Sequence, residues 1–169
     1  PAPVNEGSAL WHIGWGGIDG PSEHKWRTDQ GIKWAVDLTS VGGDFAHFMY
    51  ASGPNKEEVE IWTGTPNQRF NHVHLLAEDP NVTRDWYIDH LGAMGDKKYT
   101  PNPGPLPKDV SFDSDVKTLF SSVRNTAAVL DGVVFNFFYR LDESLFWSNG
   151  KPIKEFEKSD GCVNNHIAF

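Results

Sequence analysis

Apolar and polar residues alternate at the start of two segments of the chain, "WHIGW" and "NHVHL". Alternation is typical of a strand with one apolar face and one different face. His12 and Gly14 fall on the second face of the first strand, and His72 and His74 do so in the other. The bulky residues, which we expect to face the following helix, are Trp11, Ile13, Trp15, Val73 and Leu75.

The two segments belong to an internal repeat with a constant offset of 60 residues. His12 falls on His72, and the match continues through a capping aspartate and a tryptophan in each copy. At the end of the chain, "NNHIAF" puts His166 in the same place. The repeat therefore predicts two modules followed, at residues 160–169, by the opening strand of a third and incomplete one.

Each opening strand leads into a predicted helix. Asp79 can cap the first turn of the second helix, Pro80 suits its first position, and Gly92 marks its end. The first helix has weaker signals of the same kind. Its signals are Asp19, Pro21, Trp26 and Gly31, and the inward stripe expected for the second helix is Val82, Trp86 and Tyr87.

The remaining pattern divides the chain into modules. Residues 1–8 form an extended lead, and residues 9–64 continue after the helix through "GIKWAVDL" into a hairpin of "FAHFMYA" and "EVEIW", giving the order β-α-β-β-β. The second module, at residues 70–148, contains a Pro-rich loop at 99–109 and a strong strand, "GVVFNFFYRL". "DVSFDSDV" is a further strand candidate in this module.

Two later strands place more side chains on the face that carries the histidines. Val59 and Ile61 form the apolar face of "EVEIW", so Glu60 and Trp62 point towards the side of His12 if the strands share a sheet. By the same alternation, Asn136 and Phe138 of the last strong strand point inward.

Composition narrows the function. The chain has 169 residues and a formal charge of −8, with 15 Lys and Arg against 23 Asp and Glu. This balance disfavours nucleic acid and anionic membranes as partners, and no run is long enough for a transmembrane helix. We expect a soluble, cytoplasmic protein. A single cysteine, Cys162, leaves histidines and carboxylates as the available metal ligands.

Several of these segments resemble a known family. "FNHVHLLAEDPNVTRDWYIDHLG" and "NNHIAF" resemble the opening strands of modules in the vicinal oxygen chelate superfamily, which includes glyoxalases, bleomycin-resistance proteins and extradiol dioxygenases. "FMYASGPNKEEVEIW" resembles the closing hairpin of such a module. The resemblance implies an α+β, glyoxalase-like fold, in which the mixed sheets of two β-α-β-β-β modules pair into a cup.

Relative to that family, we expect the order of modules in this chain to be permuted or truncated. A complete family domain would continue past His166 into a helix and a closing hairpin. Either the two modules pair within this chain, or partner chains complete the cups. We favour pairing within the chain, because two exposed sheet faces would invite aggregation.

The resemblance also implies a site. His12, Glu60 and His72 match ligand positions for a divalent metal such as Fe, Mn, Zn or Ni, and His166 is a further candidate in an assembled form. His74 is interpreted as a pocket residue because its repeat partner is Gly14. The substrate pocket is expected to include His74, Trp62, Asn136 and Phe138.

Three functions stay open at this point. The leading hypothesis is a metal-dependent dioxygenase, lyase or isomerase that chelates the oxygens of a small organic substrate. The alternative is a metal-free protein of the bleomycin-resistance type, forming a homodimer that binds a small drug or metabolite, with aromatic compounds among the candidates. A remnant without activity of its own is the third.

Overall fold

The computed structural model of the chain describes residues 9–43, 45–55, 57–101, 125–139 and 167. Within these ranges, no helix has the length and apolarity needed to cross a bilayer. The lead at residues 1–8, the strand candidate "DVSFDSDV", residues 102–109 of the Pro-rich loop, Cys162 and His166 all lie outside them. The elements are β1 (Leu10–Gly16), α1 (Gly20–Asp29), β2 (Lys33–Val41), β3 (Ala46–Ser52), β4 (Glu58–Trp62), β5 (Phe70–Ala77), α2 (Pro80–Leu91), β6 (Asn125–Leu130) and β7 (Val133–Tyr139).

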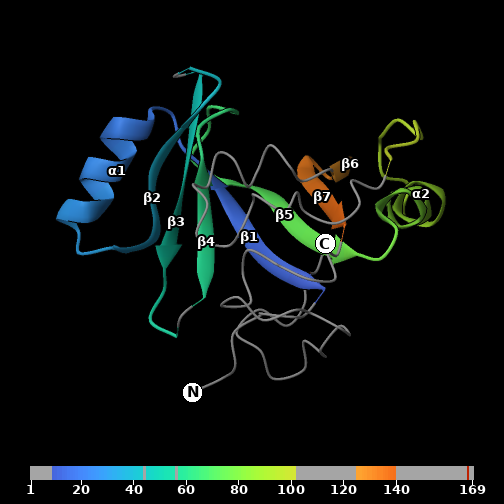
Figure 1. The fold of residues 1–169 in the computed structure, drawn as a ribbon, viewed down its shortest axis with the longest axis horizontal. Coiled ribbons are helices and arrows are strands. Elements are labelled where there is room, and N and C mark those ends of the chain that lie inside the picture. Colours follow the sequence, from blue (N-terminus) through green and yellow to red (C-terminus); the bar gives the residue numbers. More distant parts are fainter. Residues whose placement is uncertain (1–8, 44, 56, 102–124, 140–166, 168–169) are drawn as a thin grey trace, which may run out of the picture.

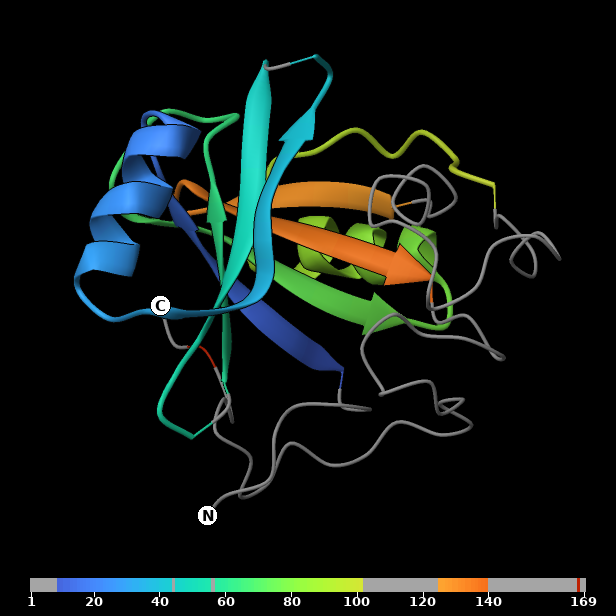
Figure 2. The ribbon, with the colours of Figure 1, turned by 60° about the vertical axis from the view of Figure 1, so that its left-hand side comes forward.

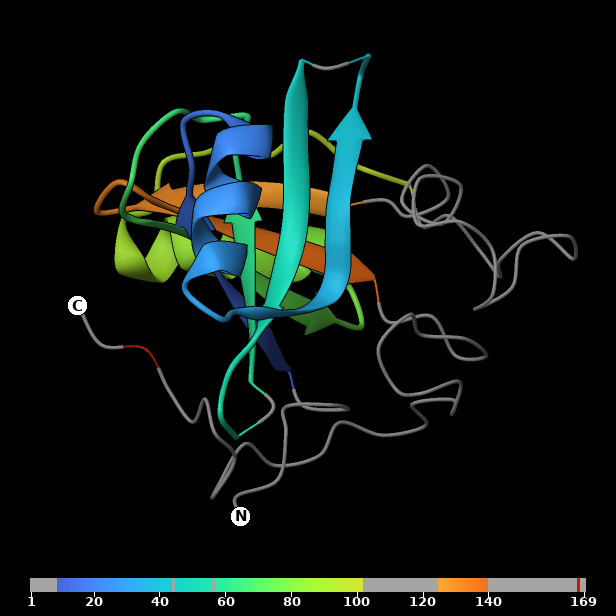
Figure 3. The ribbon, with the colours of Figure 1, turned by 90° about the vertical axis from the view of Figure 1, so that its left-hand side faces the viewer.

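The strands form one mixed sheet in the order β2-β3-β4-β1-β5-β7-β6 (Figure 1). The first half of this order is the predicted β-α-β-β-β module, with α1 beside β2 and β3 (Figure 3). The second half contributes β5, α2, β6 and β7. The predicted α+β class and the mixed sheet are therefore confirmed.

The two modules meet at β1 and β5, which pair antiparallel in the middle of the sheet. Ile13 pairs with Val73, its own repeat partner, while His12 pairs with His74 and Gly14 with His72. Equivalent residues that face each other across an antiparallel pair are related by an approximate two-fold rotation. The 60-residue repeat thus becomes a symmetry of the sheet, and the modules pair within this chain.

The expected position of Trp11 is wrong. Leu10 pairs with Leu75 and His12 with His74, so β1 carries an extra residue, Trp11, at a β-bulge. A bulge turns its side chain away from the regular alternation. The Trp11 ring therefore lies 5.4 Å from the His74 ring and 5.7 Å from the Phe138 ring, on the face opposite to α2.

The predicted helix caps are present. The Asp79 carboxylate accepts hydrogen bonds from two backbone N–H groups at the start of α2, and Asp19 accepts one from Ser22 N at 2.9 Å. Gly92 ends α2 in the left-handed region, with φ of 71°. In the first module, α1 ends at Asp29.

The outer face of the second module packs against α2, which lies behind β5 and β7 in Figure 2. Tyr87 points inward as expected, and its ring contacts those of Phe135 and Phe137. The expected inward stripe is otherwise wrong, because Val82 is 65% exposed and Trp86 50%. The core on this face comprises Leu10, Val73, Ala93, Ala128, Phe135 and Phe137.

A buried arginine takes the place that the stripe was expected to fill. Arg84 is 1% exposed, and its guanidinium donates to Lys98 O at 2.8 Å and to Thr126 Oγ1 at 2.9 Å. It also forms an ion pair with Asp85 at 2.7 Å. Arg84 therefore ties α2 to β6 and to the segment that follows the helix.

We expect Arg84→Ala to lower the free energy of unfolding by about 2–4 kcal/mol, because it removes a buried side chain and leaves part-buried acceptors without a donor. Urea denaturation of the metal-free protein measures this. Lys25→Ala is the control, because its ion pair with Asp29 is exposed and should contribute at most about 0.5 kcal/mol. Equal effects of the two substitutions would contradict the proposed role of Arg84.

Candidate metal centre

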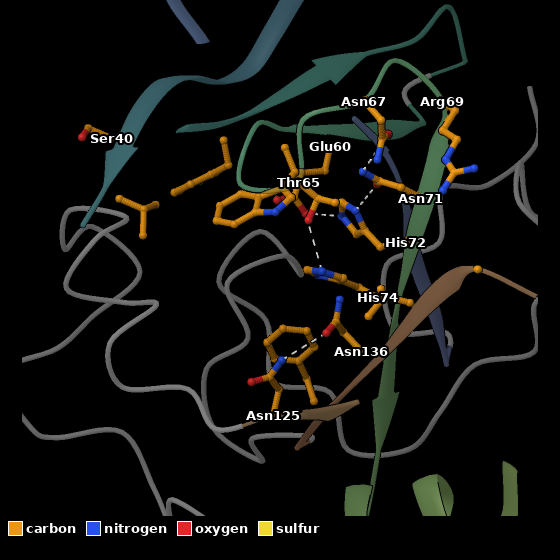
Figure 4. Close-up of a pocket in the computed structure, with 16 residues that line it drawn as sticks. Ser40, Glu60, Thr65, Asn67, Arg69, Asn71, His72, His74, Asn125 and Asn136 are labelled. Carbon is orange, nitrogen blue, oxygen red and sulfur yellow. Dashed lines mark hydrogen bonds and ion pairs between the residues drawn. The ribbon is translucent and has the colours of Figure 1, made fainter. Parts of the chain in front are cut away.

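Four side chains that could ligate a metal converge on the inner face of the sheet, from β1, β4 and β5. The Nε2 atoms of the three imidazoles lie around one oxygen, Oε2 of Glu60. The distance to that oxygen is 3.0 Å from His12, 3.1 Å from His72 and 3.6 Å from His74. All four ligand atoms lie within 4.8 Å of one another, and all four residues are buried. Figure 4 shows Glu60 facing His72 and His74.

A glycine in the middle of β1 makes this convergence possible. Gly14 pairs with Glu60 on one side and with His72 on the other. A Cβ atom at this position would overlap the imidazole of His72. The ring of His72 therefore occupies the space that a side chain at residue 14 would fill, which brings it over β1 towards Glu60.

The orientation of His72 is set by its neighbour. The Nδ1–H of His72 donates to Asn71 Oδ1 at 2.6 Å, and Asn71 in turn donates to Asn67 Oδ1 at 3.3 Å. With Nδ1 as the donor, Nε2 of the neutral ring presents a lone pair to the Glu60 carboxylate oxygen. Two lone pairs in contact repel each other, so a cation between them would be stabilising. The donor set therefore fits a divalent metal.

Packing holds the other two imidazoles. The His12 ring lies edge-on to Trp11 at 4.2 Å and to Tyr50 at 5.0 Å, while the His74 ring contacts Phe138 at 4.7 Å. The Nδ1 atoms of His12 and His74 are buried and have no hydrogen-bond partner in the described part of the chain. The bulge at Trp11 thus supplies a wall for both rings.

Tyr50 contributes to the cluster and was not predicted from the sequence. It is fully buried on β3, pairs with Glu60 across the sheet, and its hydroxyl donates to Glu60 Oε2 at 3.4 Å. Burial, followed by the negative charges of Glu60 and Glu58, raises the pKa of Tyr50 well above 10.0. The hydroxyl therefore stays protonated and can orient the carboxylate.

The charges of the cluster suit metal binding. Burial lowers the pKa of His12, and it lowers that of His74 to well below 6.5. Burial alone would raise the pKa of Glu60, but the three surrounding imidazole groups outweigh it and hold this pKa well below 4.5. Neutral imidazole and carboxylate are the forms that bind metal ions.

These pKa shifts predict that the metal-free protein loses stability in acid. Below about pH 6.5 the unfolded chain binds protons at these two histidines, whereas the folded chain does not, because burial lowers their pKa. The free energy of unfolding therefore decreases as the pH falls below about 6.5. The depressed pKa of Glu60 adds a further loss below about pH 4.5. Thermal denaturation between pH 7.5 and 4 measures the effect. A flat melting temperature down to pH 5 would contradict it, and His74→Gln should weaken the dependence near pH 6.

The cluster borders a cavity of about 610 Å³. The structure places His74, Trp62, Asn136 and Phe138, the expected pocket residues, in its wall, with Glu60 and His72. The wall also includes Val134, which alternation puts on the same face as Asn136 and Phe138, and Phe48 inside β3. The remaining wall residues lie near strand ends and in loops, where the strand pattern gives no indication. These are Ser40, Val41, Thr65, Asn67, Arg69, Asn71, Asn125 and Gly132.

Solved structures share this architecture. The chain is similar to glyoxalase I from Zea mays, with a TM-score of 0.57 and 15% sequence identity over 80% of this chain and 44% of that one. Methylmalonyl-CoA epimerase from Mycobacterium tuberculosis gives a TM-score of 0.47 and 9% identity over 78% of this chain and 89% of that one. No protein-family model and no curated protein matches the sequence.

The chain therefore has a glyoxalase-like fold, which confirms the fold expected from the sequence. The chain spans less than half the length of the Zea mays protein.

Proposed function

We propose that this protein is a divalent-metal enzyme of the glyoxalase or dioxygenase type that acts on a small organic substrate. The convergence of His12, Glu60 and His72 on one point beside the cavity carries this proposal. Two imidazoles and one carboxylate leave other positions of an ion open towards the cavity. A bound divalent ion would supply a Lewis acid that stabilises negative charge developing on a substrate oxygen.

The residues around the cluster prepare the site. Tyr50 and Asn71 hold Glu60 and His72 in position through their hydrogen bonds. On the cavity side, Trp62 and Phe138 present apolar surface that would exclude water from a bound substrate. Arg69 and several amides at the wall could bind and orient substrate oxygens.

Metal analysis of protein purified without a histidine tag tests this proposal. We expect about one divalent ion per chain, retained through dialysis and removed by a strong chelator. Titration of the chelated protein with Co²⁺, Zn²⁺, Mn²⁺, Fe²⁺ and Ni²⁺ would then rank the metals. A protein that contains no metal and takes up none of these ions would overturn the proposal.

A second candidate function rests on the character of the cavity wall. Apolar side chains, Val41, Phe48, Trp62, Val134 and Phe138, contribute to it, and this surface suits a metal-free binder of small aromatic compounds. Under this alternative, aromatic ligands quench tryptophan fluorescence equally before and after chelation. The homodimer expected for such proteins stays a prediction, and mass measurement in solution tests it.

A further inference from the structure

We propose that His74 is the fourth protein ligand of the metal, in place of a carboxylate that the symmetry of the sheet would put at residue 136. This inference rests on the proposed metal site. It deepens that proposal by assigning the ligand set and, through its charge, the class of substrate.

The two-fold relation between the modules makes the substitution visible. In the first module, Gly14 of β1 pairs with Glu60 of β4, so the donor lies on the closing strand and the opening strand has no side chain there. In the second module the equivalent neighbours are His74 of β5 and Asn136 of β7. The opening strand now carries a donor, and the closing strand carries an amide. In the second module, the side chain that could bind a metal therefore lies on the opening strand rather than on the neighbouring closing strand.

In the second module, the side chains of His74 and Asn136 make different contacts. His74 is 6% exposed, and its ring centroid lies 4.3 Å from that of His12 and 5.0 Å from that of His72. Asn136 instead accepts a hydrogen bond from Asn125 Nδ2 at 3.4 Å. Figure 4 shows His74 between Glu60 and Asn136. The imidazole of His74 therefore reaches the cluster, whereas the amide oxygen of Asn136 is engaged by Asn125.

The ligand set determines the charge of the loaded site. A divalent ion with three neutral imidazoles and one carboxylate keeps one positive charge, whereas two imidazoles and two carboxylates would neutralise it. Glu60 is the only acidic residue among those described in the cavity wall, and Arg69 adds a positive charge. The site therefore selects small substrates that bind through an anionic oxygen, such as a carboxylate or an enolate.

Proton NMR of the Co²⁺-loaded protein tests the ligand assignment directly. Each coordinated histidine gives one strongly shifted, exchangeable ring N–H resonance, so we expect three such signals in the natural protein and two in His74→Gln. Cobalt affinity should fall at least tenfold in this variant, since even the loss of partners behind the ligands costs about 10–100-fold. His90→Gln, which removes an exposed histidine on α2, should keep three signals and full affinity.

The double substitution His74→Gly with Asn136→Glu tests the charge argument, because it gives the second module the donor arrangement of the first. With Co²⁺ bound, oxalate should bind the natural protein about tenfold more tightly, or more, than this variant. Equal oxalate affinity would overturn the substrate class. If the variant does not fold, as judged by circular dichroism, oxalate affinity of Arg69→Gln against the natural protein measures the same preference, and no loss there would overturn it.

The outcomes separate this inference from the proposed function. Failure of the natural protein to bind Co²⁺ would remove both. Binding with three shifted resonances that persist in His74→Gln, or with only two in the natural protein, would overturn the role of His74 and leave the metal enzyme standing.

Discussion

Glu60→Gln is expected to lower the affinity for divalent metal by at least about 100-fold, because it removes the only carboxylate of the cluster. All three imidazoles are arranged around Oε2 of this one side chain. A neutral amide keeps the shape of the side chain but neither attracts the ion as strongly nor accepts hydrogen bonds from several neighbours. Calorimetric titration with Zn²⁺ and Co²⁺ at pH 7.5 measures the loss.

Glu58→Gln is the matched control, since residue 58 lies two positions earlier on the same strand and outside the cluster. We expect its metal affinity to stay within about twofold of that of the natural protein, because an exposed or half-buried charge outside the ligand set contributes little. Equal losses in the two variants would show that total charge, rather than coordination, governs metal uptake. Unchanged affinity in Glu60→Gln would sink the metal site.

Gly14→Ala is the second substitution with a large expected effect. The added methyl group overlaps the ring of His72, which cannot retreat without losing its short hydrogen bond to Asn71. Overpacking of this kind costs about 1–3 kcal/mol of stability. A displaced ligand ring should also lower metal affinity by at least about tenfold. Urea denaturation and metal titration measure the two effects separately.

Gly17→Ala provides the comparison. A Cβ atom there would approach Glu23, Thr63 and Ile61 at 3.0–3.3 Å, outside the metal cluster. We expect a modest loss of stability and no loss of metal affinity. If Gly14→Ala behaved in the same way, the space above residue 14 would not be what positions His72.

The 60-residue repeat predicted the main features of the sheet. It identified the two opening strands and put His12 and His72 at equivalent places, and period-two alternation placed Glu60 on the same face. These predictions succeeded because strand alternation depends on neighbouring residues. Pairing within the chain was favoured on the general ground that open sheet faces aggregate, and the β1–β5 register now gives it a specific form.

The errors arose where tertiary contacts override a local pattern. Alternation puts Trp11 on the outer face, because nothing in "WHIGW" marks the bulge that turns it inward. Apolar character puts Val82 and Trp86 on the inward stripe of α2, whereas both are exposed. The buried arginine that takes their place depends on acceptors farther along the chain, at residues 98 and 126, in addition to its neighbour Asp85. No short sequence window contains that information.

His74 illustrates a different limit. Its alignment with Gly14 favours a pocket position over a ligand position. The register shows that Gly14 leaves room for the ring of His72, so this alignment does not decide whether His74 is a ligand. The repeat relates positions, but it does not say which member of a pair across the sheet carries the donor. Tyr50 could have been suspected, since it opposes Glu60 in the hairpin of β3 and β4.

The central place of β1 also bears on how the chain folds. Both neighbours of β1, the strands β4 and β5, lie far downstream in the sequence, so β1 is enclosed only after both of them have been synthesised. Pairings across such long stretches of chain are slow to form. The cluster around Glu60 is complete only after β5 has paired with β1. The rate of metal uptake during refolding would therefore report the rate at which the two halves of the sheet come together.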